Sequence, residues 1–227
     1  MRTVIEAAGR TVELFSQGGG QDAPILLLCA GEEGGEAVFS EARALTDAPF
    51  RLAVFPVARW EEELSPWPAP RVFRGGGDFG SGADETIRRL TGEVLPRLRA
   101  EPGAADAPCY LAGYSLAGLF ALYALYRTDA FRGAASCSGS LWFPGFSEFA
   151  AENDLMGSAE RIYLSLGDRE SRTKNPVMAT VEDRTKAIAA LLRDRGVETA
   201  FELNPGNHFR DPEKRLARGV AWICERR

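Results

Sequence analysis

A chain of 227 residues, of which 45% are hydrophobic and 26% charged, has the size and composition of a globular protein with a sizeable core. Its net charge of -5 argues against nucleic acid or an anionic membrane surface as a partner. The sequence contains no run near the roughly 18 apolar residues of a membrane span. Residues 1–11 lack the pattern of a secretory signal.

The cysteines and the histidine limit the redox and metal chemistry. The four cysteines lie far apart, without a CxxC pair, at Cys29, Cys109, Cys137 and Cys224. Three of them fall in expected strands or strand ends, where cysteine behaves as a small buried hydrophobic residue. Reduced thiols of this kind predict a cytoplasmic protein. The one histidine, His208, leaves too few ligands for an ordinary zinc site, and we expect neither a metal nor another cofactor.

The first half of the chain alternates strand and helix patterns. In chain order we expect a β-hairpin over 3–15, a strand over 25–30, a helix over 36–45, a strand over 52–57, an irregular segment over 60–79 and a helix over 83–99. The run over 25–30 is continuously apolar, which is typical of a strand covered on both faces of a parallel sheet. Prolines and consecutive glycines exclude a long regular element over 60–79. Pro96 is expected to kink or end its helix.

The second half continues the alternation. We expect strands over 109–112, 134–137, 161–166 and 199–203, and helices over 116–126, 146–155, 180–195 and 216–224. Strands that alternate with helices predict an α/β fold, in which a mostly parallel central sheet has helices on both faces. Neither a repeat nor a linker divides the chain, so we expect one domain over residues 1–227.

The segment Gly113-Tyr-Ser115-Leu-Ala117 joins an expected strand to an expected helix. A serine at the apex of such a turn has the nucleophile-elbow layout, which requires small residues two positions before and two after it. Gly113 and Ala117 meet this requirement, although alanine stands where a second glycine is usual. We therefore predict that Ser115 is a nucleophile. The alternative is a serine in an ordinary turn between a strand and a helix.

Active residues of such sheets gather at the carboxyl ends of the strands. Ser115 precedes an acid and then His208 along the chain, which is the order of α/β hydrolases. His208 would take the proton from the serine as general base. Glu170 is the preferred acid, Asp168 of the same loop is the second choice, and Glu182 is the third. A pair of serine and histidine without an acid is also open.

Acyl transfer needs hydrogen-bond donors for an oxyanion. One donor is expected to be the backbone N–H of Leu116, and the other that of Gly31 or Glu32 in the loop after the strand over 25–30. Three aromatic residues are predicted to wall an apolar substrate pocket, namely Trp142, Trp67 and Phe79. The alternative for Trp67 and Phe79 is packing in the core, whereas Trp142 is favoured for the pocket because it follows a strand end near the elbow.

Four segments carry a family resemblance that covers nearly the whole chain. They are Gly113-Tyr-Ser-Leu-Ala-Gly118, Ser138-Gly-Ser-Leu-Trp142, Leu164-Ser-Leu-Gly-Asp-Arg-Glu170 and Asn204-Pro-Gly-Asn-His208-Phe209. With them the chain resembles the esterase D and enterochelin-esterase branch of the serine α/β hydrolases. The resemblance implies the α/β-hydrolase fold and a serine hydrolase of carboxylic esters, with Ser115, His208 and Glu170 at the matching positions. Ala117 departs from the family pattern, and the lid elements of larger relatives are absent.

The leading hypothesis is a carboxylesterase that acts on a small-molecule ester through an acyl-enzyme. An acyltransferase or an amide or peptide hydrolase could use the same residues, because the site sets the acyl-enzyme and not the acceptor that attacks it. A binding protein that has the hydrolase fold without catalysis is the third hypothesis. The identity of the substrate and the oligomeric state are not encoded in these patterns.

Overall fold

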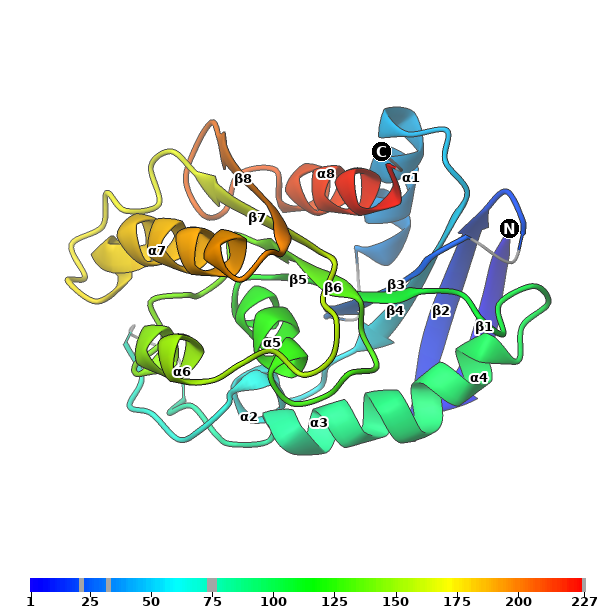
Figure 1. The fold of residues 1–227 in the computed structure, drawn as a ribbon, viewed down its shortest axis with the longest axis horizontal. Helices are drawn as coiled ribbons and strands as arrows, with labels where there is room; N and C mark the ends of the chain where they lie inside the picture. The colour runs from blue at the N-terminus through cyan, green and yellow to red at the C-terminus, as the bar shows by residue number, and fades with distance from the viewer. Residues whose placement is uncertain (21–22, 32–33, 73–76, 226–227) are drawn as a thin grey trace.

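A single mixed sheet of eight strands forms the centre of the computed structural model, which describes residues 1–20, 23–31, 34–72 and 77–225 (Figure 1). The strands are β1 (Arg2–Ala7), β2 (Arg10–Gln17), β3 (Ile25–Ala30), β4 (Phe50–Pro56), β5 (Cys109–Tyr114), β6 (Gly133–Cys137), β7 (Arg161–Gly167) and β8 (Glu198–Asn204). Their order across the sheet is β1-β2-β4-β3-β5-β6-β7-β8. The pairs β1–β2 and β2–β4 are antiparallel and all others are parallel. The predicted, mostly parallel sheet is confirmed.

Helices cover both faces of this sheet, as predicted. They are α1 (Gly35–Leu45), α2 (Trp60–Leu64), α3 (Ala83–Arg89), α4 (Leu95–Arg99), α5 (Leu116–Leu125), α6 (Phe146–Glu152), α7 (Val181–Asp194) and α8 (Pro212–Cys224). Helices α1 and α8 pack side by side over one face and enclose one apolar cluster. Helices α3, α4, α5 and α7 lie over the opposite face and enclose a larger cluster. Among the described residues, none of the helices is long and apolar enough to span a bilayer.

The hairpin at the start of the sheet follows from two residues. Ala7 pairs with Arg10, so only Ala8 and Gly9 form the turn, and both have positive φ, 54° and 68°. Positive φ at both central residues is the type I′ geometry, whose twist matches that of the flanking strands. The expected hairpin over 3–15 is therefore correct, with its turn at Ala8-Gly9.

The helix over residues 83–99 contains a proline without ending there. Residues Leu90–Val94 form a π-helical turn between α3 and α4, and the Leu95 N–H donates to the Leu90 carbonyl oxygen five residues earlier. Proline lacks an N–H and its ring collides with the carbonyl of the preceding turn in a regular α-helix. The wider turn just before Pro96 removes this collision, so the helix is locally widened instead of stopping.

The segment over 60–79, expected to be irregular, begins with the short helix α2. This helix carries three acidic residues in its first turn, but Glu63 is buried and forms an ion pair with Arg10 at 2.6 Å. The tertiary ion pair explains why a helix forms where the local pattern does not indicate one. The last helix, α8, also begins earlier than predicted, at Pro212, because proline is well suited to the first position of a helix.

Parallel register aligns the carboxyl ends of the central strands. Gly113 in β5 pairs with Cys29 in β3, and Tyr114 pairs with Cys137 in β6. At the far side, Gly167 ends β7 opposite the end of β8. The loops that follow these strand ends therefore meet along one edge of the sheet.

Candidate active site

Ser115 occupies a strained turn between β5 and α5. Its backbone has φ 58° and ψ -122°, a combination that non-glycine residues rarely adopt. The Ser115 N–H donates to the Cys137 carbonyl oxygen at 3.1 Å, and its own carbonyl accepts the Ser140 N–H at 3.0 Å. Bonds to the neighbouring strand and its loop thus maintain a conformation that presents the side chain at the sheet edge.

The small residues around Ser115 are required by close packing. A Cβ atom added at Gly113 would lie 2.2 Å from the Ala117 carbonyl oxygen and 2.8 Å from the Ala117 Cβ. Residue 113 must therefore be glycine for β5 and α5 to cross this closely. The methyl group of Ala117 fits beside it. Gly118 faces the Gly139 Cα, which a Cβ at residue 118 would approach to 3.0 Å. The departure at Ala117 is compatible with the elbow.

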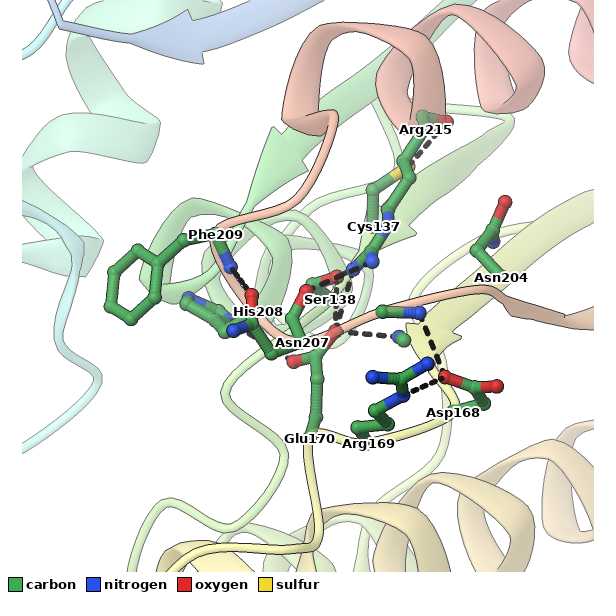
Figure 2. A network of polar contacts seen from close by, with 12 residues as sticks. Cys137, Ser138, Asp168, Arg169, Glu170, Asn204, Asn207, His208, Phe209 and Arg215 are labelled. Atoms are coloured by element: carbon green, nitrogen blue, oxygen red, sulfur yellow. Dashed lines mark hydrogen bonds and ion pairs between the residues drawn. The ribbon is translucent and has the colours of Figure 1, made fainter.

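The structure brings Ser115, His208 and Glu170 into one hydrogen-bonded chain. The His208 Nε2 lies 3.0 Å from the Ser115 Oγ, and the His208 Nδ1 lies 2.7 Å from the Glu170 Oε2. Figure 2 shows His208 and Glu170 together with the polar groups behind them. The imidazole is partly exposed, whereas the carboxylate is buried. One face of the site is thus open to a ligand while the acid is shielded from water.

Glu170 is anchored by three donors besides the histidine. Its Oε1 accepts hydrogen bonds from the Gly167 N–H at 2.6 Å, the Ser138 hydroxyl at 2.7 Å and the Arg215 Nη1 at 2.8 Å. Burial raises the pKa of this carboxyl, but hydrogen bonding and charge from His208, with the Gly167 and Ser138 bonds, outweigh burial and leave the pKa below its usual range. The group is therefore a carboxylate at neutral pH.

The other two candidate acids make different contacts. The Asp168 Oδ1 accepts the Gly206 N–H at 2.7 Å and so supports the turn after β8 (Figure 2). Glu182 pairs with Lys186 at 2.6 Å on the surface of α7. Neither carboxylate is hydrogen-bonded to His208, so Glu170 is the candidate whose geometry fits.

The first expected oxyanion donor lies at the start of α5, and the second falls partly outside the described chain. Leu116 is the first residue of α5, and among the described residues its N–H has no hydrogen-bond partner. Glu32 lies outside the described residues. Gly31 follows β3, and the pairing of Cys29 with Gly113 puts residue 31 level with Ser115. No three metal-ligating side chains cluster in the part of the chain that the structure describes.

The three predicted pocket aromatics lie in one aromatic cluster. The rings of Phe79 and Trp142 have centroids 6.1 Å apart, and only 4% and 6% of these residues is exposed. Trp67 is partly buried, and its ring centroid lies 5.9 Å from that of Phe143. Its Nε1–H donates to the Pro144 carbonyl oxygen at 2.9 Å. Core packing explains these contacts, and a role in contacting substrate stays a prediction.

Sequence reasoning missed Arg215, which is 2% exposed and donates to the candidate acid. The expected helix over 216–224 begins one residue later, so Arg215 fell in a loop. The available signal was its place beside Leu216 and Ala217, at the start of the apolar stripe of α8. Ser138 belongs to the segment Ser138-Gly-Ser-Leu-Trp142 without an expected role, and its bond to Glu170 supplies one.

Comparison with known proteins decides the family. The family model described as "Putative esterase" matches residues 32–223. The chain belongs to this esterase family. Among curated proteins, the esterase is 25% identical over 170 residues to the uncharacterized protein YbbA of Bacillus subtilis (strain 168), and the match covers 71% of this chain and 68% of YbbA.

Solved structures agree on the fold of the esterase. An IroE-like serine hydrolase from Shewanella oneidensis superposes with a TM-score of 0.77 at 16% identity, covering 98% of this chain and 80% of the other. The siderophore hydrolase EstA from Aspergillus nidulans superposes with a TM-score of 0.69 at 18% identity, covering 98% of this chain and 94% of EstA. The enterobactin esterase FES from Shigella flexneri superposes with a TM-score of 0.68 at 19% identity, covering 98% of this chain and 58% of FES. At such identities the likeness shows the fold, and the predicted α/β-hydrolase fold is confirmed.

Proposed function

We propose that this esterase hydrolyses a small-molecule carboxylic ester through an acyl-enzyme on Ser115. The hydrogen-bonded chain from Ser115 through His208 to Glu170 is the observation that carries the proposal. A nucleophile, a base within reach of its proton and an acid that orients the base are the three parts that serine-based acyl transfer requires. The residues occur in the α/β-hydrolase order at the ends of parallel strands.

In the proposed mechanism each group has a role. The Ser115 Oγ attacks the ester carbonyl carbon while the His208 Nε2 takes its proton. The imidazolium then gives this proton to the departing alcohol. A water molecule activated by the same nitrogen attacks the acyl-enzyme and releases the carboxylic acid product from Ser115. Glu170 holds the Nδ1–H and stabilises the imidazolium without accepting the proton. The Leu116 N–H donates to the oxyanion of each tetrahedral intermediate.

Siderophore esters are one candidate substrate class. The solved structures with this fold include an enterobactin esterase and a siderophore hydrolase. A substrate panel for the purified protein therefore contains enterobactin and its linear hydrolysis products beside p-nitrophenyl esters of increasing acyl length. A preference of the protein for apolar or aromatic acyl groups would support the predicted pocket role of Phe79 and Trp142.

The decisive experiment is turnover of p-nitrophenyl acetate by the wild-type protein and by Ser115→Ala. We expect kcat to fall by roughly 10³-fold or more in the variant, because the acyl-enzyme can no longer form. A fluorophosphonate probe should label wild-type Ser115, as read by peptide mass spectrometry, and leave the variant unlabelled.

A matched control is Ser136→Ala. Ser136 is buried in β6, and its hydroxyl has no hydrogen-bond partner among the described residues, so its removal should leave kcat unchanged within about threefold. Turnover that persists in Ser115→Ala, or probe attached to another residue, would reject the proposal.

A further inference from the structure

Arg215 is a buried charge outside the chain of Ser115, His208 and Glu170. It lies in the first turn of α8, and Figure 2 shows its guanidinium extending from that helix toward the strand ends. Its Nη1 donates to the Glu170 Oε1 at 2.8 Å, the Ser138 Oγ at 2.9 Å and the Tyr114 hydroxyl at 3.1 Å. Its Nη2 donates to the Asn207 carbonyl oxygen at 2.9 Å. The guanidinium is thus surrounded by acceptors.

Apart from Ser138, which follows β6, these acceptors belong to the three segments that carry the proposed reacting groups. Tyr114 immediately precedes Ser115, Glu170 is the proposed acid, and Asn207 immediately precedes His208. The Tyr114 hydroxyl also donates to the His208 carbonyl oxygen at 2.7 Å. Burial raises the pKa of Tyr114 to about 12, so this hydroxyl keeps its proton for that bond while it accepts from Arg215. One guanidinium therefore joins the elbow, the acid loop and the histidine loop.

The local packing leaves room for this guanidinium. A Cβ added at Gly167 would lie 2.8 Å from the Arg215 Nη2 and 2.3 Å from the Gly206 carbonyl oxygen. Glycine at residue 167 thus lets the acid loop, the histidine loop and the guanidinium approach one another. The planar fork of arginine can donate in several directions at once, which the single ammonium nitrogen of lysine cannot reproduce.

We propose that Arg215 is a positioning residue of the esterase reaction. It fixes one oxygen of the Glu170 carboxylate, so that the other oxygen faces the His208 Nδ1, and it holds the backbone just before His208. The inference rests on the proposed function, because it assigns to Arg215 the alignment of the groups that perform it. Pairing of two buried charges also explains why Arg215 and Glu170 are both tolerated inside the protein.

Replacement of a buried arginine that has only a structural role should affect stability but not catalysis. Arg51 is a suitable comparison, because it is 6% exposed and donates to the carbonyl oxygens of Ala23 and Gly103, at 2.8 and 2.9 Å. It pairs with Ile25 at the amino-terminal edge of the sheet, opposite the edge that carries the site. Arg51→Met therefore removes a buried arginine of the same kind without touching the proposed reacting groups.

The experiment compares Arg215→Met, Arg215→Lys and Arg51→Met with the wild-type protein. Melting temperature, kcat and KM for a p-nitrophenyl ester are measured on folded protein. Proton NMR of ¹⁵N-histidine-labelled protein follows the Nδ1–H of His208, which is unambiguous because the chain has one histidine. The NMR signal reports alignment of the imidazole with Glu170 and requires no turnover.

For Arg215→Met we expect kcat to fall by about 10²-fold with KM within about threefold, because misalignment affects the chemical steps more than binding. The Nδ1–H signal should be lost to exchange with water. Arg51→Met should lower the melting temperature but keep kcat within about threefold and retain the signal. Arg215→Lys should lose at least about tenfold in kcat, because an ammonium group cannot reach Glu170 and Asn207 together.

The proposal is overturned if folded Arg215→Met keeps the wild-type kcat, or if it keeps the Nδ1–H signal. If Arg215→Met does not fold, Arg215→Lys decides, and full activity in that variant overturns the proposal. Failure of the proposed function is separable from both outcomes. A wild-type protein that is inactive and unlabelled by fluorophosphonate would refute the esterase mechanism, while the NMR comparison would still test the positioning by Arg215.

Discussion

The charge of Glu170 is retained inside the protein because both oxygens of its carboxylate have hydrogen-bond partners. Gly167, Ser138 and Arg215 bind one oxygen, and His208 faces the other. A buried carboxylate without such partners would be protonated at neutral pH and could not stabilise an imidazolium. The environment of this residue therefore favours the charged form that the proposed mechanism needs.

Replacement of this acid by its amide tests the role of the charge. Glu170→Gln keeps the size of the side chain but removes the negative charge beside the His208 Nδ1. We expect kcat for ester hydrolysis to fall by about 10²–10⁴-fold at neutral pH, as when a triad acid is converted to an amide. The matched control is Asp168→Asn, which keeps an oxygen acceptor for the Gly206 N–H and should retain activity within about tenfold. Equal losses in the two variants would contradict the assignment of Glu170.

The same variant has a consequence for stability against pH. The pKa of Glu170 in the folded state lies below its value in the unfolded chain, which is about 4.3. Its ionisation therefore stabilises the fold fully above about pH 4.3, and this contribution is lost as the pH falls through the folded-state value. The melting temperature of the wild-type protein should consequently drop more steeply below about pH 4.3 than that of Glu170→Gln. Parallel curves from pH 7 to pH 3 would argue against this linkage.

At the scale of residues, chain order is the strongest constraint that the sequence offers. Ser115 and His208 follow strand ends in an order that few other residues could satisfy, and the structure places them within hydrogen-bond distance. Glu170 is preferred over Asp168 from the sequence, but Asp168 stays a second choice, because two carboxylates in one loop differ only in which way the chain turns. Arg215 could not be recognised, because it directly precedes the expected helix over 216–224, where an arginine is usually solvated.

At the scale of elements, the elbow formed by β5 and α5 sets the position of the serine. Gly113→Ala should destabilise the protein by about 1–3 kcal/mol, because the new methyl group would meet backbone atoms of Ala117 that have no flexible alternative. Activity should fall as well, since relief of the clash moves the turn that presents Ser115. Denaturant unfolding and esterase kinetics on the same preparation measure the two effects.

Gly92→Ala provides the control for this substitution. An added Cβ at Gly92 meets nothing within 4 Å, and the residue lies in a helical segment. We expect this change to be neutral or to stabilise by up to about 1 kcal/mol, because alanine loses less backbone freedom than glycine. A Gly113→Ala protein as stable and active as Gly92→Ala would show that the elbow is not tightly packed.

Helices and strands could be predicted where their own residues carry the pattern. They were harder to predict where contacts between distant residues decide whether the element forms. The apolar runs of β3 and β5 and the hairpin at Gly9 are encoded by their own residues. By contrast, α2 depends on the pairing of Glu63 with Arg10, two residues that are far apart in the sequence. The passage of the helix through Pro96 depends on a π-helical turn, whose hydrogen bonding the apolar periodicity does not reveal.

At the scale of the whole molecule, one sheet separates two apolar layers, and each layer contains two of the four cysteines. Cys29 and Cys109 belong to the layer under α5, whereas Cys137 and Cys224 belong to the layer under α1 and α8. All four are buried and unpaired. Burial raises the pKa of Cys29, Cys137 and Cys224 to about 12 and also raises that of Cys109. The thiols are therefore neutral and shielded in the folded protein.

This distribution makes thiol labelling a test of the expected single domain. In native buffer at pH 8, a disulfide reagent such as DTNB should leave all four cysteines unmodified and the esterase activity unchanged, because the thiolate is the reactive form. Under partly denaturing conditions the four should become reactive in one phase, since both layers share the strands of one sheet and should open together. Mass spectrometry of pulse-labelled protein assigns each site. Labelling of Cys137 and Cys224 well before Cys29 and Cys109 would show that the α1–α8 layer opens independently, and labelling of any of the four in native buffer would contradict the tight packing of both layers.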